Sequence, residues 1–147
     1  MCPPFRWDYA RFGKPGVTPG TPDETIEIAI VEHNAAAHGF NRWTLNGDAF
    51  SPETMKPMSS VREGRRYRVT VRNASDDVHP LHLHRHSFEL TRVGGGPTAG
   101  MMKDVVMLGG FQELSFDFVA DNPGRTLFHC HQQVHTDFGF MAVFEYA

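Results

Sequence analysis

The sequence lacks long apolar runs, has few cysteines and carries no excess of basic residues, and each shortage excludes a class of protein. No stretch approaches the ~20 apolar residues that cross a bilayer, and the N-terminal residues lack the apolar core of a secretory signal peptide. Two cysteines cannot hold a disulfide scaffold together. A formal net charge of −3 gives no footprint for nucleic acid or for an anionic membrane surface.

The remaining composition is that of an ordinary globular chain. With 147 residues, of which 40% are hydrophobic, the chain has the size of one compact domain. Residues 1–24 contain half of the ten prolines and predict a linker or an N-terminal arm without regular structure of any length. Residues 25–147 are expected to form the domain.

Short stretches in which apolar and polar residues alternate predict β-strands. They lie at residues 26–30, 67–71 and 114–118, and a last strand is expected at 143–146. Asn46-Gly47 is a strong signal for a tight turn, and no long window shows a helical stripe. Several short strands separated by turn signals predict an all-β fold, an antiparallel sandwich or barrel.

Histidine is unusually abundant, because seven of the nine copies fall in two short clusters. The clusters are residues 79–86 and 129–135. Side chains two residues apart on a strand point to the same face, so His82 and His84 are expected to share a face. His129 and His131 share a face in the same way, and Cys130 between them points to the opposite side. If the two strands lie side by side, two separate metal sites follow.

The site expected around Cys130 faces the interior of the domain. His79 precedes its strand and can turn inward, and His135 lies close enough after Cys130 for a short loop to return it to the same metal. A soft thiolate with two imidazoles in a trigonal arrangement suits copper and is typical of blue-copper electron-transfer centres. The axial position falls to Phe140, which cannot donate to a metal, or to Met141. Without an axial donor, we expect the reduced copper to be favoured and the reduction potential to rise.

The other site consists of four imidazoles projected outward, those of His82, His84, His129 and His131. They suit more than one copper ion, and because one face supplies ligands from one side only, the site stays open or is completed by a second domain. Zinc is the natural rival, but it usually takes Cys-x-x-Cys or paired-histidine spacings. Solvation of a strand face explains a lone histidine rather than seven at these spacings. His86 is expected only to cap the cluster or to bond to a ligand.

The motifs His79-Pro80-x-His82-x-His84 and His129-Cys130-His131-x-x-x-His135 resemble the two copper motifs of the C-terminal cupredoxin domain of multicopper oxidases, the laccase-type enzymes. The resemblance implies a single cupredoxin-like (plastocyanin-like) Greek-key β-sandwich or barrel over residues 25–147. It also implies a role for each ligand. The type 1 copper would be held by His79, Cys130 and His135 with Phe140 at the non-coordinating axial position, the type 2 copper by His82, and the type 3 pair by His84, His129 and His131.

By the same resemblance, the chain is expected to be an oxidoreductase domain. A phenol, an aromatic amine or a metal ion would lose one electron at the type 1 copper, and a trinuclear cluster would reduce O2 to water. Catalysis is expected to depend on Cys130, His129 and His131, which connect the two sites. Family members usually work in the periplasm or outside the cell. No nucleic-acid partner and no membrane span are expected.

The resemblance also implies that this sequence contains only half of the histidines that bind the trinuclear cluster. The N-terminal domain of the family supplies two further His-x-His pairs to the cluster, and outside the two clusters of this sequence only His33 and His38 remain, in an apparent loop. We therefore expect a fragment, or a protein whose cluster is completed by another cupredoxin domain or chain, a second copy of this chain included.

Three other functions stay open on the sequence. A stand-alone blue-copper electron-transfer cupredoxin needs His79, Cys130 and His135 and leaves the four outward histidines unexplained. A copper nitrite reductase also has a second copper at a domain interface, but it carries one histidine beside the cysteine where this sequence has two. A histidine-rich copper buffer would bind weakly and without a thiolate charge-transfer band. Copper stoichiometry and O2 consumption separate the oxidase from the electron carrier, and nitrite turnover without O2 turnover would favour the nitrite reductase.

Overall fold

The computed structural model of the protein describes residues 8–147, which form two packed β-sheets. In spatial order, the first sheet contains β2 (Phe40–Leu45), β1 (Glu24–Ala37), β4 (Arg66–Asn73), β9 (Glu113–Val119), β6 (Phe88–Val93) and β7 (Gly96–Lys103). The second sheet contains β3 (Pro57–Val61), β11 (Met141–Tyr146), β10 (Thr126–Cys130), β5 (His79–Leu83) and β8 (Val105–Leu108). The described residues also contain two short helices, η1 (Tyr9–Phe12) and α1 (Gln133–Asp137). The predicted all-β Greek-key sandwich is confirmed.

Alternation along the strands explains why the two sheets pack. Strands β4 and β10 bury every second side chain, so that each sheet turns an apolar face toward the other. Aromatic rings bridge the layers, with ring centroids 6.1 Å apart for Phe116 and Phe128 and 6.2 Å apart for Phe118 and Phe144. Full burial of one such side chain stabilises the fold by roughly 1.5–3 kcal/mol. The prediction that the sandwich is antiparallel is wrong in one respect, because both sheets are mixed: β1 pairs with β4, and β3 with β11, in parallel.

The hairpin of β1 and β2 is longer than the sequence predicts. His33 lies in β1, opposite Arg42 of β2, and not in a loop, whereas His38 lies beyond the end of β1. Residues 32–37 have little intrinsic strand preference. The ladder to β2 pairs Glu32, His33 and Ala37, with an irregularity between His33 and Ala37 where Ala35 has a φ of 53°. Both histidines are exposed, and neither lies among the clustered histidines.

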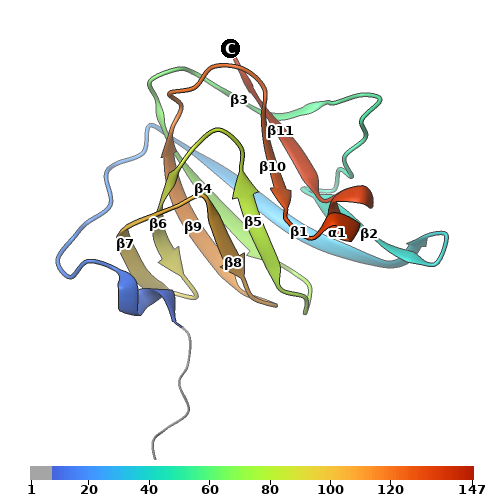
Figure 1. Ribbon diagram of the computed structural model, residues 1–147, viewed down its shortest axis with the longest axis horizontal. Helices are drawn as coiled ribbons and strands as arrows, with labels where there is room; N and C mark the ends of the chain where they lie inside the picture. The colour runs from blue at the N-terminus through green and yellow to red at the C-terminus, as the bar shows by residue number, and fades with distance from the viewer. Residues whose placement is uncertain (1–7) are drawn as a thin grey trace, which may run out of the picture.

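The described part of the N-terminal arm begins with η1, which packs beside β7 at the edge of the first sheet (Figure 1). The hydroxyl of buried Tyr9 accepts a hydrogen bond from the Met107 backbone N–H at 3.0 Å, and the Lys14 N–H donates to the Ala99 carbonyl at 3.0 Å. Its regular structure is the single helical turn of η1. The first seven residues of the predicted arm lie outside the described residues, and the boundary at residue 24 stays a prediction.

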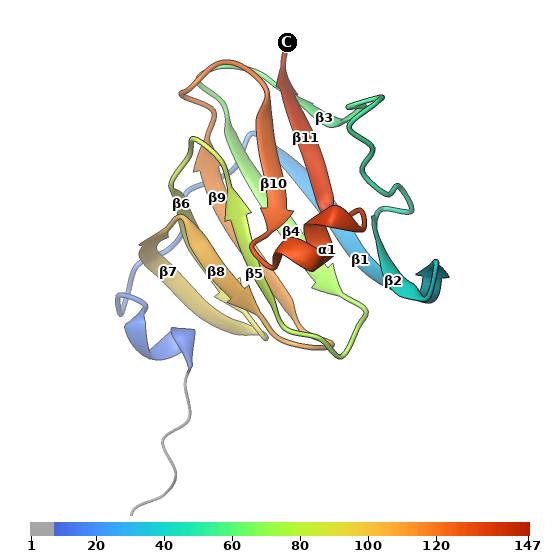
Figure 2. The same cartoon turned by 45° about the vertical axis from the view of Figure 1, so that its right-hand side comes forward.

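The register of β5 against β10 positions the two histidine clusters. The strands are antiparallel, with His129 opposite His82 and Cys130 opposite Leu81 (Figures 1 and 2). Because successive side chains of a strand point to opposite faces, Cys130 and Leu81 are directed into the sandwich. His129 and His82 are therefore directed away from it.

Candidate metal centre

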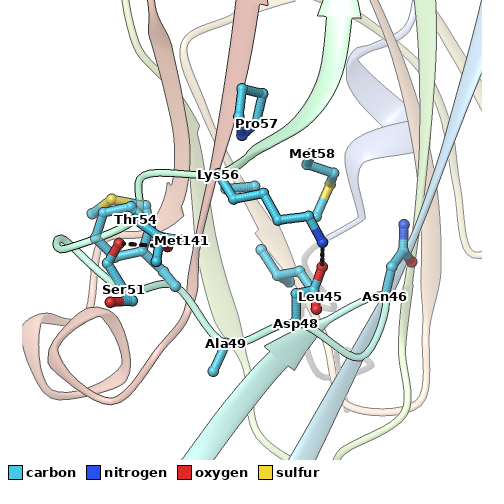
Figure 3. Close-up of a pocket in the computed structure, with 12 residues that line it drawn as sticks. Leu45, Asn46, Asp48, Ala49, Ser51, Thr54, Lys56, Pro57, Met58 and Met141 are labelled. Atoms are coloured by element: carbon cyan, nitrogen blue, oxygen red, sulfur yellow. Dashed lines mark hydrogen bonds and ion pairs between the residues drawn. The ribbon is translucent and has the colours of Figure 1, made fainter.

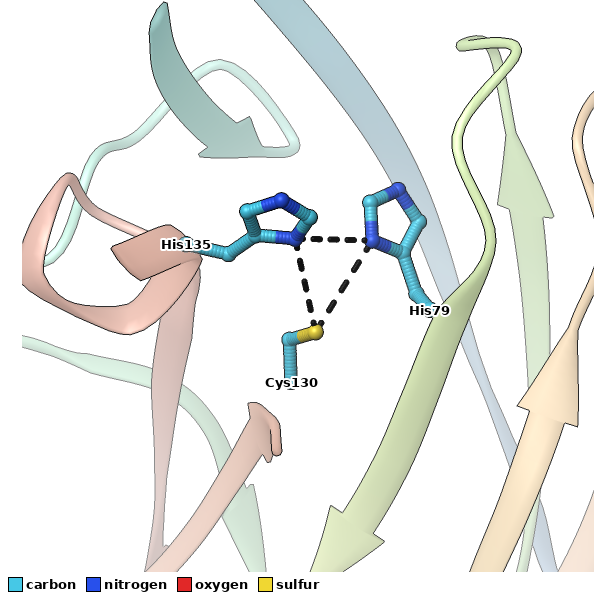
Figure 4. A group of neighbouring side chains, drawn as sticks. All are labelled: His79, Cys130 and His135. Carbon is cyan, nitrogen blue, oxygen red and sulfur yellow. Dashed lines mark hydrogen bonds between the residues drawn. The ribbon is translucent and has the colours of Figure 1, made fainter. Parts of the chain in front are cut away.

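Three ligand-type atoms converge inside the sandwich (Figure 4). Cys130 Sγ lies 3.8 Å from His79 Nδ1 and 3.6 Å from His135 Nδ1, and the two Nδ1 atoms are 3.2 Å apart. Across residues 8–147, the three side chains form a group whose ligand atoms all lie within 4.8 Å of one another. We call this group the inner site. The structure thus brings together the three residues that the sequence selects for a type 1 copper.

Strand ends and one helical turn hold the inner site. His79 is the first residue of β5 and Cys130 the last of β10. Where a short loop is expected from the sequence, the chain forms α1 (Figure 2), which returns His135 to the sulfur (Figure 4). The Thr136 hydroxyl donates to the Cys130 carbonyl at 2.7 Å and fixes this helix against β10.

Burial controls the protonation of the inner site. It lowers the pKa of His79 to about 4, with a smaller contribution from the charge of His135, and it also lowers the pKa of His135. Burial raises the pKa of the Cys130 thiol to about 11, although the Gln132 backbone N–H bonds to the sulfur at 3.4 Å. At neutral pH both imidazoles are therefore neutral donors, and a metal that binds the sulfur releases a proton.

Two aromatic side chains enclose the inner imidazoles. The indole of Trp43 lies 4.8 Å from the His79 ring and 4.5 Å from the His135 ring, measured between ring centroids. The fully buried Phe140 ring lies 4.8 Å from the His79 ring. Phe140 is thus beside the inner site, where the sequence places a non-donating neighbour. The contact of Trp43 with both imidazoles is one that sequence reasoning missed, because only the fold brings β2 to this end of the sandwich.

The four outward histidines, His82, His84, His129 and His131, lie together on the other side of β5 and β10, and we call them the outer face. Neighbouring ring centroids are 4.8 Å apart for His82 and His131 and 4.9 Å for His84 and His129. The Nε2 atoms of His84 and His129 approach to 2.8 Å. Partial burial lowers the pKa values of His84 and His129, followed by repulsion from neighbouring imidazoles for His84. At neutral pH these two rings are therefore neutral, the form in which an imidazole can bind a metal.

Backbone carbonyls orient two imidazoles of the outer face. His82 Nδ1 donates to the Asp104 carbonyl at 2.7 Å, and His129 Nδ1 donates to the Cys130 carbonyl at 2.7 Å. A carbonyl only accepts hydrogen bonds, so Nδ1 carries the proton in both rings. The Nε2 atom of each ring then keeps the lone pair that can bind a metal. Buried His86 stands behind this face, since its ring bonds to the His84 carbonyl at 2.9 Å and to the Tyr146 hydroxyl at 2.7 Å.

The donor set of the inner site fits copper better than zinc. A structural zinc site is closed by four donors in a tetrahedron, whereas here two imidazole nitrogens and one sulfur converge beside a phenyl ring. A trigonal site of two histidines and one cysteine with a weak axial neighbour is the arrangement that suits copper. On the outer face, four imidazoles come from one side only and leave the opposite side for further ligands.

A hollow of about 280 Å³ opens beside the inner site and is lined in part by His135, Asp77 and Trp43. The His135 Nε2 atom is 3.9 Å from Asp77 Oδ2. Phe40 and Phe138, whose rings stack at 4.9 Å, form an apolar wall. The Nε2 edge of His135, a predicted metal ligand, is therefore directed toward a partly apolar surface hollow that contains the Asp77 carboxylate.

A second hollow, of about 290 Å³, lies between β2, the following loop and β11 (Figure 3). Lys56 Nζ pairs with Asp48 Oδ2 at 2.9 Å across it, and Met58 and Met141 also line it. None of the seven predicted metal ligands contributes to its lining.

A buried sulfur with two imidazoles, enclosed by a Greek-key sandwich that carries more imidazoles on the outside of the same strands, defines a cupredoxin-type domain. The chain belongs to the multicopper oxidase family, whose sequence model matches residues 21–147. The membership predicted from the two motifs is confirmed, and copper is the cofactor of this family. The assignment to the C-terminal domain stays a prediction.

Curated relatives are similar over most or half of this chain. Multicopper oxidase MmcO of Mycobacterium tuberculosis is 33% identical over 127 residues, which are 86% of this chain and 24% of that protein. Laccase-4 of Trametes villosa is 36% identical over 52% of this chain and 16% of its own length. Bilirubin oxidase of Albifimbria verrucaria is 33% identical over 69% of this chain and 19% of its own length. The chain thus spans about a quarter or less of these relatives.

Solved structures show the same fold. A multi-copper oxidase from Pseudomonas thermotolerans matches with a TM-score of 0.71 and 25% identity, over 87% of this chain and 31% of that one. A metallo-oxidase from Campylobacter jejuni, 23% identical, matches with a TM-score of 0.76 over 90% of this chain and 32% of its own. Among residues 8–147, no helix has the length and apolar character to span a membrane.

Proposed function

We propose that this chain is the domain of a multicopper oxidase that takes up electrons at a type 1 copper and contributes half of a trinuclear cluster. One observation carries the proposal: the inner sulfur and two Nδ1 atoms lie within 3.8 Å of one another, and the same two strands direct four imidazoles to the opposite side. The proposed ligands are His79, Cys130 and His135 for type 1, His82 for type 2, and His84, His129 and His131 for type 3.

When bound, copper would take single electrons from a reductant at the inner site and deliver four of them, with four protons, to O2 at the outer face, giving two waters. The chain supplies the connection between the sites. Cys130 is joined through its backbone to His129 and His131 on either side, so an electron on the sulfur has a short covalent route to the outer face. The Phe140 ring excludes water and offers no axial donor.

The hollow beside His135 favours an aromatic reductant over a hydrated metal ion. Its wall of Phe40 and Phe138 suits a ring, and Asp77 can accept the proton of a phenol or an aromatic amine as the electron leaves through His135. Substitution Asp77→Asn should slow the bleaching of the copper-loaded chain by a phenol about 100-fold, the lower range for general-base catalysis. An Asp77→Asn variant bleached as fast as wild type by phenols would favour a different proton acceptor, and preferential bleaching by ferrous ion would favour a metal-ion substrate.

The outer face requires a partner to complete its ligand set. Another cupredoxin domain or chain, which can be a second copy of this chain, would supply the opposite imidazoles and create the place where O2 is reduced. The location proposed from the family resemblance is the periplasm or the extracellular space. A stand-alone electron carrier would use the inner site alone and would have no use for the outer face.

Copper quantification and mass measurement on one sample test the proposal. We expect one copper per chain with an intense blue absorption in the monomer, and additional copper with O2 consumption only in an assembly that completes the outer face. A colourless copper complex would contradict the inner site. One copper per chain in every assembly, without O2 consumption, would instead support the carrier.

A further inference from the structure

We infer that Ser75 and Asn73 are positioning residues for the inner site, because their hydrogen bonds hold His79 in the tautomer whose Nδ1 lone pair faces the Cys130 sulfur. The inference rests on the proposed function for its use, but its geometry can be tested without copper. All three side chains are buried, with exposed fractions of 2% for Asn73, 4% for Ser75 and 0% for His79.

The chain of reasoning begins with the amide of Asn73, the last residue of β4. Its Nδ2 group donates to the Asp77 carbonyl at 2.8 Å and to the Gly109 carbonyl at 3.0 Å. Both partners can only accept, so these two bonds fix which atom of the amide is nitrogen. The other atom, Oδ1, is therefore an acceptor.

The Ser75 hydroxyl has one proton, and it donates this proton in a hydrogen bond to Asn73 Oδ1. The Ser75 hydroxyl is 2.8 Å and the Ser75 backbone N–H 3.0 Å from this oxygen. Because an amide oxygen cannot donate, the hydroxyl donates to Asn73. Toward His79 Nε2, which is 3.2 Å away, the hydroxyl oxygen is then left as an acceptor.

The tautomer of His79 follows from this direction. A neutral imidazole carries one N–H, and the bond to Ser75 places it on Nε2. The Nδ1 atom keeps its lone pair, 3.8 Å from Cys130 Sγ and 3.2 Å from His135 Nδ1. The opposite tautomer would place a proton in the middle of the donor set and leave a buried Nε2 facing the oxygen of Ser75, two acceptors in contact.

The two imidazoles of the inner site differ in this respect. His79 is held through Ser75 and Asn73 by the connection between the two sheets, since β4 belongs to the first sheet and β5 to the second. His135 has its Nε2 atom at 3.9 Å from Asp77 Oδ2, beyond hydrogen-bond distance, and lines the hollow. The inferred device thus makes His79 the fixed ligand, while His135 is the ligand next to the proposed substrate.

Nitrogen-15 NMR of the metal-free full chain tests the tautomer directly. We expect His79 Nε2 to show the shift of a protonated ring nitrogen and Nδ1 that of an unprotonated one in wild type. Substitution Ser75→Ala should redistribute the proton between the two nitrogens and weaken cuprous ion binding by about 10–100-fold, the usual effect of removing a residue that orients a metal ligand. Ser75→Thr, which keeps the hydroxyl, should restore most of the affinity.

Ser115→Ala is the matched control, because Ser115 is also buried and its hydroxyl bonds to Thr70 at 3.2 Å within the first sheet. It should change neither the His79 tautomer nor cuprous ion binding, measured by competition with a coloured chelator. A wild-type His79 protonated at Nδ1, or a Ser75→Ala variant with the wild-type tautomer and affinity, would overturn the inference. Failure of wild type to bind copper with the expected tautomer intact would count against the proposed function instead.

Discussion

Side chains that alternate along β5 and β10 have two different environments. On the inner side, His79 and Cys130 are fully buried, and every donor atom of the site comes from this chain. On the outer side, four imidazoles are partly or fully exposed and face away from the sandwich. The comparison shows how a single strand pair can complete one metal site and offer half of another. Burial encloses the inner site within this chain, whereas the outer face is open on one side, and we propose that a second protein surface completes it.

The largest effect is expected from removing the sulfur. Substitution Cys130→Ser should abolish the intense blue absorption of the copper-loaded chain, because the colour of such a site requires the copper–thiolate bond. The exposed histidines should be unable to replace it. His131→Ala serves as the control and should keep the band, which absorption spectroscopy with copper quantification can establish. A blue Cys130→Ser protein would remove the distinction between the two sides.

Removal of one imidazole from the outer face should affect that face alone. Substitution His129→Ala should lower the rate of O2 consumption in the completed assembly by more than about 100-fold. Loss of a residue that only supports a metal ligand costs up to about that much, and His129 is a proposed ligand itself. The inner absorption band should persist, since the His129 side chain points away from the sandwich. An oxygen electrode and a visible spectrum of the same sample report the two outcomes. Simultaneous loss of both signals in a folded variant would show that the faces are not independent.

The buried histidines of the inner site should also make the stability of the metal-free protein depend on pH. Burial lowers the pKa of His79 to about 4 from a reference of 6.5, so the unfolded chain binds the proton more strongly. The metal-free protein should therefore lose about 3 kcal/mol of unfolding free energy as pH falls from about 6.5 to 4. The lowered pKa of His135 acts in the same direction. Urea unfolding at several pH values measures the slope, and His79→Phe should flatten it. A slope that is unchanged in this variant would contradict the assignment.

The smallest effect on stability is expected at Phe140. Substitution Phe140→Met conserves volume well enough that unfolding free energy should change by less than about 1.5 kcal/mol. A thioether beside the inner copper is a weak axial donor, so the reduction potential should fall while the blue colour remains. Redox titration measures the potential. Phe140→Leu, which adds no donor, is the control and should leave the potential near that of wild type.

Much of the candidate site can be predicted from the alternation of side chains along a strand, which directs odd and even positions to opposite faces. The spacing of His129, Cys130 and His131 forces the sulfur and its neighbours to opposite faces of any strand, and β10 is such a strand. The position of His135 was predictable only as proximity, because α1 is too short to show a helical period. The His33 segment was wrongly expected to be a loop, since its extended form depends on pairing with β2.

The supporting residues had weaker signals. Asn73 and Ser75 follow the strand that is expected at residues 67–71, and β4 ends at Asn73. Nothing in this segment indicates that the Asn73 amide would direct the Ser75 hydroxyl and, through it, His79. The contact of Trp43 with two imidazoles is likewise a consequence of how β2 and α1 meet.

The sequence by itself determined which atoms can bind a metal and which of them share a face, because the alternation of side chains along a strand is a local property of the backbone. The tertiary structure decided that residues 79 and 135 meet at the sulfur of residue 130. It also decided which ring nitrogen carries the proton. The first outcome depends on contacts of His79 with Cys130 and His135, which lie 51 and 56 residues further along the chain. The second depends in part on the bond from Asn73 to Gly109, 36 residues away, and only the packing of the two sheets brings such segments within bonding distance.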